Sequence, residues 1–307
     1  MKNASLGRSV PLDFPVPAAG VRHRLADYIA LTKPRLNLLV IVTSGVGFYV
    51  GAGSRIDLLR LLQTMIGTAC VAGGAAGLNQ IYERDRDRLM HRTRMRPLPD
   101  GRLSVGEALV FSLALSSIGL VQLAVGANML AALAALATLL VYTSVYTPMK
   151  LRTPAATFVG AVPGALPPLI GWAAARGTLS LGAWTLFAIV FCWQIPHFFA
   201  IAWLYRDDYR RAGFPMLPVI EPEGRRTGRQ AVVFAALLVP VAAAPFFVGL
   251  AGSSYLGGSL ILSLSLLALA IQFASDRSTL RARRLFFGSL VYLPVLWALL
   301  MIDLVKH

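Results

Sequence analysis

Nine long apolar runs constrain the fold of this chain more than any other feature. Each run is long enough to cross about 30 Å of hydrocarbon as an α-helix. Because a backbone in lipid must satisfy its own hydrogen bonds, we expect every run to be helical. The expected spans lie near residues 37–53, 58–80, 105–126, 128–147, 156–175, 181–203, 230–250, 255–274 and 285–304. The sequence therefore predicts an all-α fold, a polytopic membrane helical bundle of about nine transmembrane helices.

Composition supports this fold class. The chain is 56% hydrophobic and 14% charged, with a mean hydropathy of +0.65, whereas about a quarter of the residues in a soluble domain are charged. The fifth run must be kinked, since it carries several helix breakers (Gly160, Pro163, Gly164, Pro167, Pro168 and Gly171). We expect a polar N-terminal arm over 1–36 and a single intramembrane domain over 37–307.

The basic residues fall on one side of this topology. All but four of the 29 Lys and Arg residues lie in the N-terminal arm or in alternate connections; the exceptions are Arg55, Arg60, Arg176 and Lys306. The positive-inside rule then predicts a cytoplasmic N-terminus and a C-terminus outside. This distribution explains the net charge of +15 without a nucleic-acid partner. The N-terminal arm lacks a long Arg/Ser-rich amphipathic stretch, which favours a bacterial cytoplasmic membrane over a mitochondrial one.

The connection after the second run carries an unusual set of acids. Asn79, Glu83 and Asp87 recur at spacings of four, which places them in a row along one face of a helix that continues past the apolar run. Asp85 falls on the opposite side. Clustered oxygen ligands suit Mg²⁺, which often takes one or two carboxylates together with substrate phosphates. The alternative is a solvated loop whose acids pair with Arg84, Arg86 and Arg88.

A second acidic site follows the sixth run, at Asp207 and Asp208. Two acidic helix ends that face each other across a bundle could hold metal ions against a diphosphate, while arginines take the remaining phosphate oxygens. The short connection after the fourth run adds Lys150 and Arg152 on the same side. Simple anchoring by the positive-inside rule explains these two cations equally well.

These stretches resemble the motifs of a known family. The run from Asn79 to Asp87, followed by Arg92-Thr-x-x-Arg96-Pro-Leu, resembles the first aspartate-rich motif of UbiA-type intramembrane prenyltransferases, in particular those that farnesylate protohaem IX. Five further stretches match in order: Leu31-Thr-Lys33-Pro34-Arg35, Tyr146-Thr-Pro-Met-Lys150-x-Arg152-Thr153, Gly164-x-x-Pro167-Pro168-x-x-Gly171-Trp172, Trp193-Gln-x-Pro196-His197-Phe and Asp207-Asp208-Tyr209-x-x-Ala-Gly213. Past about residue 225 the resemblance is one of hydropathy only.

The resemblance implies transfer of a farnesyl group from farnesyl diphosphate to a vinyl group of protohaem (haem B), with addition of water, to give haem O. An allylic diphosphate ionises readily once its leaving charge is neutralised, so such an enzyme needs Mg²⁺ and cations. The implied Mg²⁺ ligands are Asn79, Glu83, Asp87, Asp207 and Asp208, with Asp85 a weaker candidate. The implied substrate contacts are Arg88, Arg92, Tyr146, Lys150 and Arg152. The lipid bilayer and a haem A synthase are further candidate partners.

His197 lies within an apolar run directly after Pro196. Ionisable residues inside a membrane are candidates for function. The ring could bind the haem iron, since His is a common haem ligand, or handle a proton. It could also be structural and bond a carbonyl that Pro196 leaves free.

Two other functions stay open at this stage. The first is prenyl transfer to an aromatic or quinone precursor, which uses the same chemistry. The second is transport, for which nine spans with a broken helix would also be reasonable. Transporters usually place their ionisable groups near the midplane, whereas the acids here lie at helix ends, and this favours phosphate chemistry at a membrane face.

Overall fold

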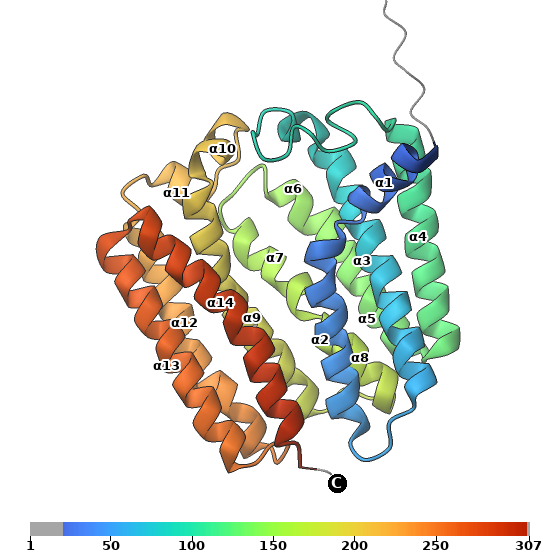
Figure 1. The fold of residues 1–307 in the computed structure, drawn as a ribbon, viewed down its shortest axis with the longest axis vertical. Helices are drawn as coiled ribbons and strands as arrows, with labels where there is room; N and C mark the ends of the chain where they lie inside the picture. Colours follow the sequence, from blue (N-terminus) through green and yellow to red (C-terminus); the bar gives the residue numbers. More distant parts are fainter. Residues whose placement is uncertain (1–20, 306–307) are drawn as a thin grey trace, which may run out of the picture.

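The computed structural model describes residues 21–305, with side chains from residue 24 onward. This part of the chain is helical and contains no β-strand (Figure 1). The elements are α1 (Val21–Leu31), α2 (Pro34–Ala52), α3 (Leu58–Asp87), α4 (Val105–Gly126), α5 (Met129–Leu140), the π-helix η1 (Val141–Tyr146), α6 (Thr147–Met149), α7 (Ala156–Ala165), α8 (Pro167–Arg176), α9 (Leu181–Leu204), α10 (Arg206–Arg211), α11 (Leu217–Ile220), α12 (Arg225–Phe247), α13 (Ser253–Asp276) and α14 (Thr279–Ile302).

Nine helical segments of the described chain are long and apolar enough to span a membrane, and each coincides with one of the nine predicted runs. The helices of the second, seventh and ninth spans extend beyond the predicted apolar runs, to Asp87 in α3 and from Arg225 and Thr279 in α12 and α14. These extensions are polar. They continue the helices past the apolar segments. Hydropathy marks the end of an apolar run and not the end of the helix, so the predicted bounds were shorter.

Two spans are built from more than one helical piece. The fourth consists of α5, η1 and α6 in succession, and its π-helical turn carries Tyr142 and Tyr146. The fifth is broken at Leu166 between α7 and α8, because Pro167 and Pro168 supply no backbone N–H to the preceding turn. The predicted kink of the fifth run is therefore confirmed.

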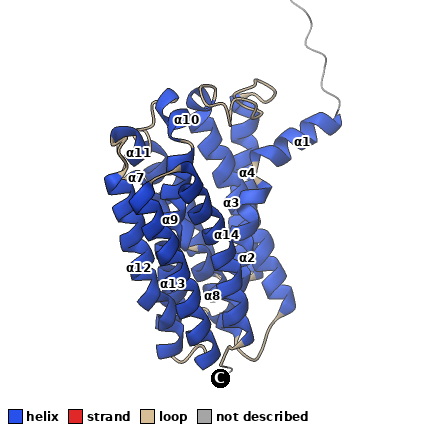
Figure 2. Ribbon diagram, turned by 60° about the vertical axis from the view of Figure 1, so that its left-hand side comes forward, coloured by secondary structure: helices blue, strands red, loops and turns tan. Residues whose placement is uncertain are grey.

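One end of the bundle carries most of its charged connections. We call this the polar end, and define it by residues 88–104, 150–155 and 205–224. Figure 1 shows α10 and the connection after α3 together at this end, while α14 ends at the opposite end. Figure 2 shows α1 extending sideways from the polar end. The charge distribution predicts that the polar end faces the cytoplasm. Residues 1–20 of the predicted N-terminal arm lie outside the described residues.

Small residues let the central helices approach closely. A Cβ added to Gly47 of α2 would lie 2.1 Å from the Pro168 carbonyl oxygen of α8, and one on Gly171 would lie 1.8 Å from the Ser44 carbonyl oxygen. In lipid, helices associate through such close packing because burial of apolar surface no longer drives association. The outward faces remain apolar, with exposed side chains such as Val110, Val125 and Ile261.

Candidate active site

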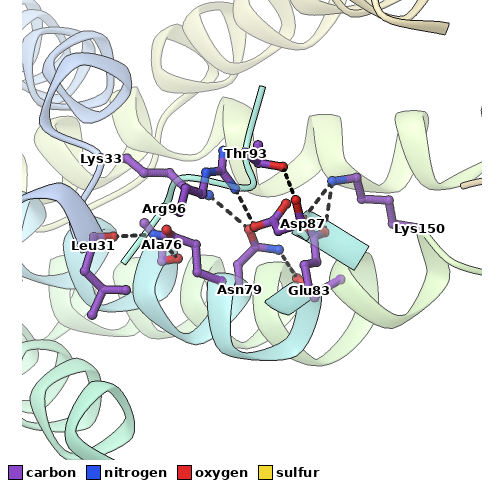
Figure 3. Close-up of polar contacts among 11 residues, drawn as sticks. Leu31, Lys33, Ala76, Asn79, Glu83, Asp87, Thr93, Arg96 and Lys150 are labelled. Carbon is purple, nitrogen blue, oxygen red and sulfur yellow. Dashed lines mark hydrogen bonds and ion pairs between the residues drawn. The ribbon is translucent and has the colours of Figure 1, made fainter. Parts of the chain in front are cut away.

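The polar face of α3 forms the base of the candidate site. Asn79, Glu83 and Asp87 are buried, with exposed fractions of 3%, 2% and 0%. Figure 3 shows the three side chains extending from α3 toward one group of neighbours. Asp85 lies on the outer side of the helix, where 72% of its side chain is exposed. Asn79, Glu83 and Asp87 therefore lie on one face of α3 and Asp85 on the other, as the helical periodicity predicts.

Each of these three buried side chains contacts a different cation. Lys33 Nζ donates to Asn79 Oδ1 at 3.1 Å, and Arg96 Nη1 donates to Asp87 Oδ2 at 2.7 Å. Lys150 Nζ donates to both carboxylate oxygens of Glu83. The three cations come from the segments before α2, after α3 and after α6, so they converge only in the folded bundle (Figure 3).

The solvated-loop alternative holds for Asp85 alone. The Asp85 carboxylate accepts from Arg84 Nε at 3.0 Å and lies 3.9 Å from Arg88 Nη1. Glu83 and Asp87 instead turn inward and pair with distant parts of the chain, so pairing with the neighbouring arginines is wrong for these two acids. A charged loop at a membrane surface does not bury two carboxylates in this way.

The surroundings shift the pKa values of Lys33 and Lys150 in opposite directions. Burial, together with the Arg96 guanidinium, lowers the pKa of Lys33 to about 7. Burial alone would also lower the pKa of Lys150, but the Glu83 carboxylate beside it more than offsets this effect and raises the pKa above its ordinary value. Lys150 therefore carries a full charge at neutral pH. Lys33 has a left-handed backbone (φ 50°), which is uncommon for a residue with a side chain.

The oxygen atoms of this face fit a hard divalent cation. Asp87 Oδ1 is buried and has no hydrogen-bond partner, which is costly unless a ligand satisfies it. No group of three or more His, Cys, Asp or Glu side chains in residues 24–305 gathers as a complete metal cluster. Mg²⁺ takes one or two carboxylates and completes its shell with water and phosphate oxygens, and this face offers two carboxylates, one of them with an unpartnered oxygen. Asn79, Glu83 and Asp87 could hold it.

Asp208 lies at the same end of the bundle as this face. It is buried in α10, forms an ion pair with Arg211 and accepts a 3.4 Å hydrogen bond from the backbone N–H of His91, four residues after Asp87. The structure thus brings Asp208 against the segment that follows α3. Asp207 points outward instead, with 68% of its side chain exposed and Arg210 as its partner.

A small apolar cluster joins the connections of the polar end. Its buried members come from the segment after α3 and from the α10 region (Met90, Tyr209, Ala212 and Phe214). Arg86 Nη1 adds a 2.8 Å hydrogen bond to the Ala212 carbonyl oxygen, and Lys150 Nζ lies 4.7 Å from the centre of the Phe214 ring. These contacts hold the second acidic segment over the end of α3.

The other predicted phosphate contacts lie farther out. Arg88 Nε donates to the Pro99 carbonyl oxygen at 2.9 Å, and the Arg92 guanidinium stacks over Tyr205 at 5.2 Å. Arg152 is exposed. Of the predicted cations, only Lys150 touches the acidic face. Lys33 and Arg96 also touch it. The spacing of four in α3 does not point to these two residues, although both occur within the motifs that carry the resemblance.

A mostly apolar cavity of about 350 Å³ opens beside this charged group. Lys33 and Asn37 line it near the polar end, and mainly apolar and aromatic residues line the rest, together with Thr43, Thr138 and Gln194. The lining includes Tyr142, Tyr146, Trp193, Gln194, His197 and Phe198. Its volume falls in the range of small-molecule sites. Tyr146 and His197 are both predicted substrate contacts. They thus share one cavity with Lys33, which contacts Asn79 of the acidic face.

Comparison with known proteins identifies the family of the chain. A model of the UbiA prenyltransferase family matches residues 39–292. The protoheme IX farnesyltransferase of Solibacter usitatus (strain Ellin6076) is 48% identical over 288 residues, which cover 91% of this chain and 99% of that protein.

Solved structures show the same fold at low sequence identity. A digeranylgeranylglyceryl phosphate synthase matches with a TM-score of 0.77 at 18% identity, over 92% of this chain and 98% of that one. A UbiA homologue from Archaeoglobus fulgidus, solved with GPP and Mg²⁺ bound, matches with a TM-score of 0.62 at 20% identity, over 89% and 99%. The transporter interpretation is therefore set aside: this multi-pass membrane chain belongs to the UbiA prenyltransferase family.

Proposed function

We propose that the protein transfers the farnesyl group of farnesyl diphosphate to a vinyl group of haem B, with addition of water, to give haem O. One observation carries the chemistry: a buried face of oxygen donors, held by three cations, lies beside an apolar cavity. The choice of haem is supported by the relative that is 48% identical and named protoheme IX farnesyltransferase. The alternative acceptor is an aromatic or quinone precursor.

Asn79, Glu83 and Asp87 are the proposed Mg²⁺ ligands, with Asp208 approaching from α10 and Asp207 as a more peripheral candidate. Bound Mg²⁺ would supply charge that stabilises the departing diphosphate. The homologue solved with GPP and Mg²⁺ supports this choice of metal. The site therefore needs no strong nucleophile of its own.

The cations have two tasks in this mechanism. Lys33, Arg96 and Lys150 hold the carboxylates and the amide in place, and their remaining N–H groups can donate to diphosphate oxygens. Arg88, Arg92 and Arg152 lie farther out and can draw an anionic substrate toward the polar end. Charge that develops on the leaving group is thus met by donors already positioned by the fold.

The cavity protects the reacting allylic group. Its lining is mainly apolar, which suits a farnesyl chain and keeps bulk water away from the carbocation. Tyr142 and Tyr146 also line the cavity, and aromatic rings can stabilise positive charge. We place the protein in a bacterial cytoplasmic membrane, with the polar end inside. A haem A synthase is a candidate partner because it would consume the product.

The test is an assay in membranes that contain the expressed protein. Farnesyl diphosphate and Mg²⁺ are supplied with either haem B or 4-hydroxybenzoate, and the products are identified by mass spectrometry. We expect farnesylated, hydrated haem only in the haem reaction, and its loss when EDTA removes Mg²⁺. Prenylated 4-hydroxybenzoate without any haem product would refute the haem assignment and favour the alternative acceptor.

A further inference from the structure

The imidazole of His197 contacts a serine from the last span. His197 Nδ1 lies 2.8 Å from Ser289 Oγ of α14. The ring also stacks on Trp193 and Phe286, with centroid distances of 5.3 Å and 5.1 Å. Trp193 Nε1 donates to the Ser289 carbonyl oxygen at 2.8 Å. Helices α9 and α14 thus fix the position of this ring together.

The serine hydroxyl settles which nitrogen carries the proton. Ser289 Oγ donates its only hydrogen to the Phe286 carbonyl oxygen at 2.6 Å. With that hydrogen engaged, the hydroxyl oxygen is placed to accept from His197, and this hydrogen-bond network assigns the imidazole proton to Nδ1. In the neutral ring the lone pair then belongs to Nε2. A charged ring among these apolar helices would be costly.

The Nε2 edge of the His197 ring is free to contact a molecule in the cavity. His197 lines the cavity, while its Nδ1 is hydrogen-bonded and its ring stacks on two aromatic side chains. No side chain or backbone group in residues 24–305 hydrogen-bonds to Nε2. A bare imidazole nitrogen at the wall of an apolar cavity is a ligand position for a transition metal such as iron.

We propose that Ser289 is a positioning residue that fixes the Nδ1–H tautomer of His197, so that Nε2 binds the iron of the haem substrate. This inference rests on the proposed function, because it takes haem as the acceptor. A metal-binding His almost always donates its other ring N–H to an acceptor, which orients the ring and strengthens the bond. Ser289 and the Phe286 carbonyl provide that support here. The structural alternative expected a backbone carbonyl freed by Pro196 as the partner of His197, whereas the ring bonds the Ser289 hydroxyl instead. That alternative also gives no role to the lone pair on Nε2.

The test compares two porphyrins that differ only in the metal. Purified full-length protein is titrated with ferric protohaem and with metal-free protoporphyrin IX, and the visible spectrum is followed. We expect His197→Ala to weaken haem binding by at least about tenfold and to alter the haem spectrum. Binding of metal-free protoporphyrin should stay at the wild-type level, which shows that the variant is folded. Added imidazole should restore the wild-type haem spectrum.

Ser289 is tested with a matched control. Ser289→Ala should weaken haem binding by about 10–100-fold without affecting the metal-free porphyrin, and Ser289→Thr should restore most of the affinity. Ser263→Ala removes a similarly buried hydroxyl, which pairs with Tyr292 at 2.9 Å and does not line the cavity. It should leave the haem spectrum unchanged.

The outcomes separate this inference from the proposed function. If the wild-type protein binds neither porphyrin, haem is not the acceptor and the proposed function fails. If the wild type binds haem and His197→Ala leaves both affinity and spectrum unchanged, iron binding by His197 is wrong while the function stands. Equal weakening of both porphyrins would also overturn the inference, since it would make His197 a packing residue.

Discussion

Lys150 Nζ lies 2.9 Å and 3.1 Å from the two carboxylate oxygens of Glu83, although the residues are 67 positions apart in the chain. This pair joins the end of the fourth span to the second span. Both side chains are largely buried, with 12% and 3% exposed. Loss of either partner would leave an uncompensated charge in the site.

Replacing Glu83 with Gln should abolish most activity. The change keeps the shape of the side chain. It removes the negative charge that pairs with Lys150 and that we propose binds Mg²⁺. We expect kcat/KM to fall by about 10²–10³-fold, whereas Glu83→Asp should keep much of the activity at raised Mg²⁺. The measurement is initial rate against Mg²⁺ concentration. Equal losses for both variants would argue against a role that depends on charge.

Asp87 and Asp85 form a matched pair, two residues apart on opposite sides of α3. Asp87 is buried with one unpartnered oxygen, whereas Asp85 is exposed. We expect Asp87→Asn to lower kcat/KM by about 10²-fold or more and Asp85→Asn to leave it near the wild-type value. Membrane insertion should be normal for both. A similar loss for Asp85→Asn would contradict the assignment of the buried face.

Asp208 and Asp207 offer the same comparison on α10. Asp208 is buried and contacts the segment after α3, while Asp207 points outward. Asp208→Asn should reduce turnover strongly and raise the Mg²⁺ requirement, whereas Asp207→Asn should have a small effect. Rates at saturating farnesyl diphosphate distinguish the two. A larger loss for Asp207→Asn would make the peripheral carboxylate the metal ligand.

Gly160 sets the position of Tyr146 in the cavity. A Cβ at Gly160 would lie 2.5 Å from the Tyr146 ring, so Gly160→Ala must displace the ring. We expect a loss of about 1–3 kcal/mol in stability from overpacking and a raised KM for farnesyl diphosphate. Gly257→Ala, in open space on α13, is the control and should be neutral or slightly stabilising. Thermal unfolding in detergent and substrate titration provide the measurements.

The spans were predictable because hydrophobic length alone determines them, and the spacing of four was enough to place Asn79, Glu83 and Asp87 on one face. The partners of these residues were not predictable in this way. Lys33 and Arg96 reach the face from separate segments, and no periodicity relates positions 33, 79 and 96. Ser289 was harder still, since it lies in an apolar run where only packing against α9 reveals its contact with His197.

The three cations that meet the acidic face come from segments on both sides of α3 in the chain. As the protein is synthesised, Lys33 emerges before the carboxylates and Arg96 soon after them, but Lys150 follows only once two further spans have been made. Residues 33–150 are thus the shortest stretch of chain that contains the acidic face and all three of the basic side chains that contact it. We therefore expect the first four spans to pack together during membrane insertion, rather than one helix at a time.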